Sequence, residues 1–133
     1  MRFLVRSLAV AALLGGCMTV TRVPLVNAPG APAADGSVLV SAAPNGNTRL
    51  SVEVKHLAPP ERLAPGAKVY VAWTQARGGQ PQNVGAIVID DNRSGRLETV
   101  TPLPTFELFI TAEGFPTAAV PSGPRVLFGV VEQ

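Results

Sequence analysis

The chain is short of the residue types from which most catalytic and metal sites are built. It contains one cysteine, one histidine, one tryptophan and one tyrosine among 133 residues. A single cysteine excludes an intramolecular disulfide and a thiolate zinc site, and the single histidine excludes a histidine-based metal cluster within one chain. Neither a Gly-x-Ser-x-Gly motif nor a glycine-rich phosphate loop before a helix occurs. The sequence therefore predicts a protein that is not an enzyme and holds no cofactor or metal.

Charge is scarce as well, because Asp, Glu, Lys and Arg together make up 15% of the chain. The formal net charge is +2, with eleven basic and nine acidic residues, and two of the basic residues, Arg2 and Arg6, lie at the extreme N-terminus. Without these two, nine basic residues face nine acidic ones. A net charge of zero without a basic cluster excludes the electrostatic footprint of a nucleic-acid partner.

The N-terminal segment has the pattern of an export signal. Arg2 and Arg6 are followed by an unbroken apolar run over 8–14, which ends in small residues. The stretch Leu14, Gly15, Gly16, Cys17 resembles the lipobox of bacterial lipoproteins. That resemblance implies removal of a signal peptide over residues 1–16 and attachment of a diacylglycerol lipid to Cys17. Met18 in place of Asp favours the outer membrane of a Gram-negative cell, facing the periplasm, by the sorting rule of that family.

Two alternatives to lipidation remain open. An uncleaved transmembrane anchor needs about 20 apolar residues, and Arg6 together with Gly15 and Gly16 makes the run too short for one. Alternatively, Cys17 is an incidental cysteine in an ordinary cleaved signal. The spacing of charge, apolar run and cysteine favours lipidation over both.

Residues 17–36 are expected to form a flexible tether. Pro24, Pro29 and Pro32 interrupt this segment, and a proline fixes its own φ and biases the preceding residue to extended conformations. The apolar residues Val20, Val23, Leu25 and Val26 leave a short first strand as an alternative within it.

From residue 37 onward, runs of strand-forming residues alternate with turns rich in Gly, Pro and Asn, and no helical segment of useful length occurs. The runs predict seven strands, at 37–42, 48–57, 68–76, 83–90, 96–101, 105–111 and 124–132. The predicted fold is all-β, an antiparallel seven-stranded immunoglobulin-like β-sandwich over 37–133. Trp73 is expected at the centre of its core. The inward-facing set is predicted to include Leu50, Val52, Val54, Val69, Val71, Trp73, Ile87, Ile89, Leu97, Phe106, Leu108, Ile110, Val126 and Phe128.

The second half of the chain contains a spaced set of residues, namely Leu63, Pro65, Gly66, Tyr70 and Trp73, then Val84, Gly85, Asp90, Asp91 and Gly95, and finally Phe106 to Ile110, Thr111, Glu113, Gly114, Pro121 to Pro124, Val126 and Leu127. In these residues it resembles the extracytoplasmic β-domain of anti-sigma-K factors. These are mostly turn and core residues, so they bear on fold more than on activity. In that family a transmembrane helix and a cytoplasmic sigma-binding domain precede the β-domain, and neither pattern is present here.

Three local patterns were weighed as sites. Asp90, Asn92, Ser94 and Gly95, with Glu98 at the ninth position, match part of an EF-hand loop, but Thr101 stands where a bidentate Glu completes the calcium shell. A hairpin turn is the favoured interpretation. His56 is expected to be a solvated residue at a strand end. Asp90 and Asp91 are adjacent, and adjacent strand residues point to opposite faces, which argues against paired catalytic acids.

The sequence thus predicts a lipid-anchored protein of the bacterial cell envelope whose β-sandwich is a non-catalytic binding module. Its expected partners are the membrane, through the lipid on Cys17, and an envelope protein or glycan that the sequence does not identify. An alternative, suggested by the anti-sigma-K resemblance, is a sensory or regulatory outer domain that modulates a membrane signalling partner. A purely structural role is a third alternative.

Overall fold

The computed structural model describes residues 19–133, so the predicted signal peptide and the lipobox with Cys17 lie outside the described residues. The described part consists of β-strands joined by loops, with two short 3₁₀ turns and no α-helix. The strands are β1 (Thr21–Asn27), β2 (Asp35–Ala42), β3 (Thr48–Lys55), β4 (Val69–Gln75), β5 (Gln82–Ile87), β6 (Gly95–Thr101), β7 (Phe106–Glu113) and β8 (Arg125–Val131), and the 3₁₀ turns are η1 (Pro44–Gly46) and η2 (Pro60–Arg62).

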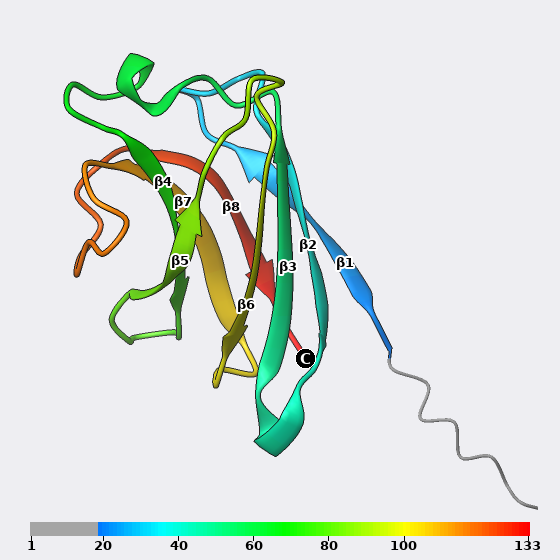
Figure 1. Cartoon of the computed structure of the whole chain (residues 1–133). Coiled ribbons are helices and arrows are strands. Elements are labelled where there is room, and N and C mark those ends of the chain that lie inside the picture. Colours follow the sequence, from blue (N-terminus) through cyan, green and yellow to red (C-terminus); the bar gives the residue numbers. More distant parts are fainter. Residues whose placement is uncertain (1–18) are drawn as a thin grey trace, which may run out of the picture.

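The eight strands form one antiparallel sheet in the order β5-β4-β7-β8-β1-β2-β3-β6 (Figure 1). The sheet curls until its two end strands, β5 and β6, lie beside each other. At this seam the hydroxyl of Thr99 on β6 donates a hydrogen bond of 2.7 Å to the carbonyl of Val84 on β5. Next to Val84, a Cβ on Gly85 would lie 2.8 Å from a methyl group of Leu97, so a glycine permits the close approach. The all-β prediction is confirmed, in the form of a nearly closed sheet.

Strand β1 accounts for the main difference from the prediction. Its first part, from Thr21 to Leu25, pairs with β2, whereas Val26 and Asn27 pair with β8, so that β1 joins the two halves of the sheet. After it, the amide of Asn27 donates a 2.6 Å hydrogen bond to the Pro32 carbonyl and fixes the turn into β2. The prediction of a flexible tether over 17–36 is therefore wrong for residues 21–36, whereas the alternative of a short first strand within it is confirmed. The sheet thus has eight strands instead of seven.

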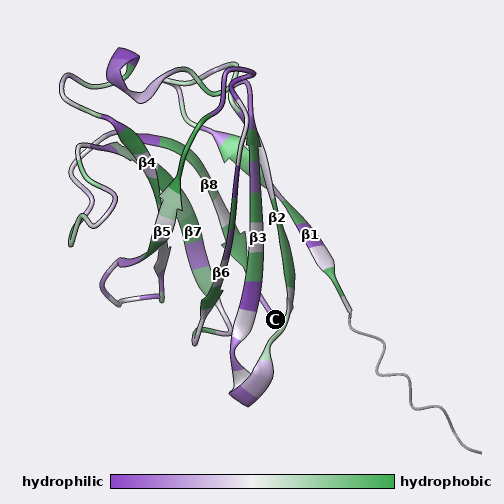
Figure 2. Ribbon diagram, in the orientation of Figure 1, coloured by the Kyte–Doolittle hydropathy of each residue, from purple (hydrophilic) through white to green (hydrophobic). Residues whose placement is uncertain are grey.

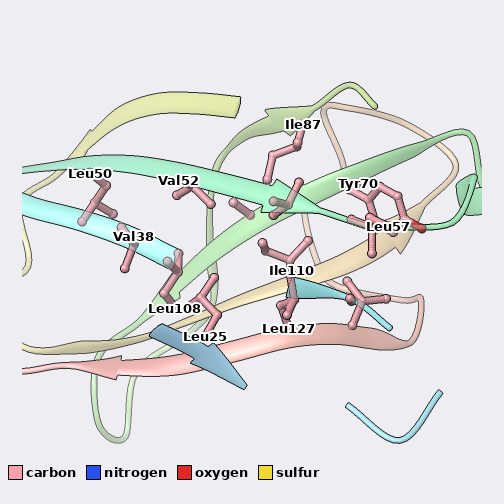
Figure 3. Close-up of a cluster of buried hydrophobic side chains, with 14 of the residues drawn as sticks. Leu25, Val38, Leu50, Val52, Leu57, Tyr70, Ile87, Leu108, Ile110 and Leu127 are labelled. Atoms are coloured by element: carbon pink, nitrogen blue, oxygen red, sulfur yellow. The ribbon is translucent and has the colours of Figure 1, made fainter. Parts of the chain in front are cut away.

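The seven strands predicted from residue 37 onward are confirmed as β2 to β8, each within a few residues of its expected bounds. The main core fills the inside of the curled sheet (Figure 3), and hydrophobic residues predominate in β8 and alternate with more polar residues in β4 and β7 (Figure 2). Predicted inward residues that lie in this core are Leu50, Val52, Val54, Ile87, Phe106, Leu108, Ile110 and Val126. Ile89 and Leu97 are only partly buried at its margin.

The face assignment of β4 is wrong. The main core contains Tyr70 and Ala72, whereas Val71 and Trp73 point to the opposite face of the sheet. There they form a second, small cluster with Phe109, flanked by Val69, Ala118 and Phe128. Trp73 is fully buried, but it is the centre of this outer cluster and not of the main core.

Antiparallel pairing divides the loops between two ends of the domain. The end that contains Thr21, here called the proximal end, carries the loops at 43–47, 76–81 and 102–105 and the residues after β8. The opposite, distal end carries the loops at 28–34, 56–68 and 88–94 (Figure 1), and the β7–β8 loop at 114–124 starts from it. At this end the Leu57 amide donates to the Arg93 carbonyl at 3.1 Å, which ties two of the distal loops together.

Candidate functional site

The β7–β8 loop folds back over the outer face of β4 and β7 and covers the small cluster. The amide of Asn83 on β5 donates hydrogen bonds of 3.0 and 2.9 Å to the carbonyls of Pro116 and Ala118. Ala118 then packs against the cluster around Trp73, whereas the Phe115 side chain is 73% exposed. The loop is therefore a second layer over one face of the sheet, with an aromatic side chain displayed to solvent.

The carboxylate of Glu113, at the end of β7, holds the other end of this loop. Its oxygens accept hydrogen bonds from the Ser122 hydroxyl at 2.6 Å, the Ser122 amide at 3.1 and 3.2 Å and the Gly123 amide at 3.1 Å. The Thr111 hydroxyl donates a further bond of 2.5 Å. Because a buried carboxylate costs much free energy unless its oxygens are paired, this set of donors is what permits Glu113 to be buried.

The protonation of Glu113 follows from these donors. Burial raises the pKa of the Glu113 carboxyl, but the hydrogen bonds from the Ser122 and Thr111 side chains and from the Gly123 and Ser122 amides together outweigh burial and lower the pKa below its ordinary value. Glu113 is therefore an anion at neutral pH. Its oxygens are already occupied by donors, which makes it a structural anchor instead of a proton-transfer group.

The same network reaches Trp73. Its indole Nε1 donates a 2.8 Å hydrogen bond to the hydroxyl oxygen of Thr111, which in turn donates to Glu113. The Trp73 ring stacks on Phe109 with the centroids 6.4 Å apart. The guanidinium of Arg125 lies 3.9 Å from the centroid of the Phe109 ring and forms an ion pair of 2.8 Å with Glu107. Hydrogen bonds, ring stacking and an ion pair thus connect the side chains on the outer face, and no buried side-chain nitrogen or oxygen among residues 19–133 lacks a hydrogen-bond partner.

A cavity of about 340 Å³ lies beside the Glu113 network. Residues from three separate segments of the chain meet around it, namely Pro65 and Gly66, Glu113 and Gly114, and Ser122 and Gly123. A Cβ on Gly123 would lie 1.6 Å from the Ala112 carbonyl oxygen, so only glycine fits there. The turn residues of these three segments therefore build one local structure around the Glu113 carboxylate.

A second cavity, of about 390 Å³, lies at the distal end between η2 and the β5–β6 turn. Side chains of both charges line it. The acidic ones are Glu61, Asp90 and Asp91, and the basic ones are Lys68 and Arg93. Val88, which also lines the cavity, is 78% exposed. An open hollow with charges of both signs and an exposed apolar side chain can bind a ligand or partner surface.

Tyr70 forms the inner wall of this distal cavity. Its hydroxyl donates a hydrogen bond to the Ala58 carbonyl, which connects β4 to the loop that leads into η2. Burial, and to a smaller extent the nearby charge of Glu61, raises the pKa of Tyr70 to about 12. The phenol therefore stays protonated and fixes the wall of the cavity.

The residues that match part of an EF-hand loop do not surround a common point where a calcium ion could bind. Asp90 Oδ1 accepts the amides of Asn92 and Ser94, each at 2.9 Å, within a tight turn in which Arg93 has a positive φ of 61°. Beyond Ser94, β6 runs away from this turn toward the proximal end, where Thr101 is buried. The predicted tight turn is confirmed, but it is not the turn of a β-hairpin, because β5 and β6 are not paired and lie at the two ends of the sheet.

The remaining sequence candidates lie in exposed positions. His56 is exposed at the end of β3 with a positive φ of 55°. Asp91 is exposed in the turn beside Asp90. Sequence reasoning did not identify Asn83, Thr111 or Glu113 as members of a network. The signal was an acidic residue at the last position of the strand at 106–113, directly before a glycine.

Among residues 19–133, no group of His, Cys, Asp and Glu side chains has the geometry of a metal site, and no helix has the length and apolar character needed to cross a membrane. Comparisons of the chain with protein-family models, with curated proteins and with solved structures give no match.

Proposed function

We propose that this chain is a lipid-anchored protein of the bacterial cell envelope whose β-domain is a non-catalytic binding module. The anchor is the lipid on Cys17 of the lipobox, and the outer membrane, facing the periplasm, is the proposed location. The observation that carries the binding role is the distal cavity, where Lys68 and Arg93 lie with Asp90, Asp91 and an exposed Val88 around one hollow. Such a surface suits an envelope protein or a glycan.

The immunoglobulin-like sandwich is part of this proposal. One half of the sheet contains β2, β3 and β6, and the other half contains β5, β4, β7 and β8. The chain therefore passes between the halves three times, from β3 to β4, from β5 to β6 and from β6 to β7. This exchange between two facing layers is the arrangement of such sandwiches, with β1 as an addition. An experimental structure with two layers about 10 Å apart supports it, whereas continuous backbone pairing between β5 and β6 would contradict it.

The binding role is tested by photo-crosslinking in intact envelopes. A photoreactive amino acid replaces Val88 at the distal cavity, and the matched control replaces Val26, which is exposed on β1 and does not line the cavity. The proposal predicts a discrete adduct for position 88 and none for position 26. The charge reversals Asp91→Lys and Arg93→Glu should each reduce the adduct several-fold. Absence of any adduct at position 88, or adducts that charge reversal leaves unchanged, would refute the binding role.

Lipidation is tested separately by mass spectrometry of the protein purified from membranes. The expected mature N-terminus is an acylated Cys17, and Cys17→Ser should release the protein from the membrane fraction. A mature chain that begins at any other residue would refute the anchor.

A further inference from the structure

We infer that the proximal end of the domain contacts the phospholipid headgroups of the bilayer and that the distal cavity points away from the membrane. The inference rests on the proposed lipidation of Cys17 and adds to it an orientation and a membrane-contact surface. It follows from where β1 begins, from the length of the strands and from the distribution of charge over the loops.

The connection between the lipid and the sheet is short. Strand β1 begins at Thr21, whose position is fixed by pairing with Val40 of β2. Four residues from Cys17 to Thr21 span at most about 14 Å when fully extended. Thr21 therefore lies within about 14 Å of the lipid attachment point, whatever path the connection takes.

The domain is longer than this connection. Strands of seven or eight residues, such as β1 and β2, extend for about 25 Å. In an inverted orientation, with the distal loops on the bilayer, Thr21 would lie about 25 Å above the membrane, which is beyond the reach of the connection. Covalent geometry thus excludes the inverted orientation and keeps the start of β1 close to the bilayer.

The charges of the loops favour the same orientation. The proximal loops at 43–47 and 102–105 contain no charged residue, and the loop at 76–81 contains only Arg77. The distal loops carry Glu61, Arg62, Lys68, Asp90, Asp91 and Arg93. Removing charged groups from water at a membrane surface is unfavourable, so the charge-poor proximal end approaches the headgroups more readily than the distal end.

The charged side chains near the proximal end fit a phospholipid surface. Arg77, in the 76–81 loop, and Arg49, exposed near the start of β3, are basic and suit headgroup phosphates. Arg22, exposed near the start of β1, is also basic. Two acidic residues lie at this end, Glu132 after β8 and Glu107 near the start of β7, and the charge of Glu107 is paired with Arg125 at 2.8 Å. Val20 and Val130 add exposed apolar side chains at this end. We therefore assign the bilayer surface, and not a protein partner, to the proximal end.

The test uses the full lipidated protein in vesicles of phosphatidylethanolamine and phosphatidylglycerol. Because the thiol of Cys17 is blocked by lipid, one added cysteine can be labelled uniquely with an environment-sensitive fluorophore. Thr105→Cys labels the proximal end, and Asn92→Cys is the matched, equally uncharged distal position; both residues are exposed. Headgroup spin-labelled lipid should quench the probe at 105 at least threefold more than the probe at 92. Equal quenching, or stronger quenching at 92, would overturn the inference.

A longer connection provides the control. Insertion of twenty Gly and Ser residues between Val20 and Thr21 gives the connection a typical reach of about 27 Å. With this insertion, the ratio of quenching at position 105 to quenching at position 92 should fall from about threefold toward one. A difference that survives the insertion would contradict the short connection as its cause. Absence of acyl mass on Cys17 would refute the proposed anchor, whereas an acylated protein with equal quenching refutes the orientation alone.

Discussion

The hydroxyl of Ser122 donates a 2.6 Å hydrogen bond to the carboxylate of Glu113 across the base of the β7–β8 loop. The contact joins the last residue of β7 to the approach to β8, and the amides of Ser122 and Gly123 bind the same carboxylate. One buried anion therefore fixes the loop that covers Trp73.

Replacement of Glu113 by Gln removes the charge but preserves the shape. Because hydrogen bonds to charged groups contribute about 1.5–3 kcal/mol, Glu113→Gln should lower the free energy of unfolding by about that amount. Urea denaturation monitored by Trp73 fluorescence measures the change. Glu98→Gln is the control, because Glu98 is exposed and pairs with Arg96 at 3.7 Å, and it should change stability by under about 1 kcal/mol.

The lowered pKa of Glu113 also predicts an acid dependence. The unfolded chain has the ordinary value of 4.5 and the folded protein a lower one. The stability that Glu113 contributes is therefore complete above pH 4.5 and is lost as the pH falls through the folded-state pKa. In Glu113→Gln this part of the acid dependence should disappear. An unchanged acid profile in the variant would contradict the role of the carboxylate.

Tyr70 is the only tyrosine, so its ionisation can be followed by ultraviolet absorbance. Its pKa of about 12, raised from 10.0, predicts an alkaline midpoint near 12 in the folded protein. Burial of the neutral phenol stabilises the fold fully below pH 10 and loses its effect as the pH rises toward 12. Tyr70→Phe removes the signal and the donor to the Ala58 carbonyl and should destabilise by about 1 kcal/mol. A native midpoint at 10 would show that the phenol is solvated.

Two glycine-to-alanine substitutions should differ in their effect on stability, because one position is tightly packed and the other is open. In Gly123→Ala the new Cβ would lie 1.6 Å from the Ala112 carbonyl oxygen, so the loop must move. We expect a loss of about 3 kcal/mol or more, at the upper end of overpacking effects. Gly30→Ala is the matched control, because nothing lies within 4 Å of its Cβ. It should be neutral or stabilise by up to about 1 kcal/mol. Similar thermal midpoints for the two variants would contradict the packing described for Gly123.

Asp90 and Asp91, adjacent in the β5–β6 turn, should differ sharply in their contribution to stability. The Asp90 carboxylate accepts two backbone amides, at 2.9 Å each, whereas Asp91 is exposed beside it. Asp90→Ala should lower stability by about 1–2 kcal/mol, and Asp91→Ala should change it by under about 0.5 kcal/mol. Thermal denaturation of both variants measures the difference. Equal effects would show that the carboxylate does not hold the turn.

Local signals in the sequence were sufficient to predict most strands. Turns such as Asn45-Gly46 and Asp90-to-Gly95 separate runs of β-branched residues, and each run became a strand between β2 and β8. Strand β1 was only an alternative to a tether in the sequence, because Pro24 lies within it and proline is normally restricted to strand edges. Its place is explained by tertiary structure, since β1 leaves β2 just after Pro24 and continues beside β8.

The faces of β4 and the Glu113 network depend on contacts that periodicity does not encode. In β4 both faces are buried, so the alternation of Val71 and Trp73 with Tyr70 and Ala72 does not reveal which face is inner. The choice is made by the β7–β8 loop, whose Ala118 covers Trp73 from more than forty residues away in sequence. Without the path of that loop, Glu113 cannot be recognised as its anchor.

The pairing of β1 with β8 also has a consequence for the time course of folding. Val26 lies opposite Phe128 and Asn27 opposite Leu127, so the first and last strands of the described residues meet about a hundred residues apart in sequence. Such distant contacts slow the search for the native state, because the entropy of a long loop is lost before the contact forms. The last two residues of β1 can therefore pair only when the chain up to β8 is available, so the contact between β1 and β8 requires almost the whole described sequence.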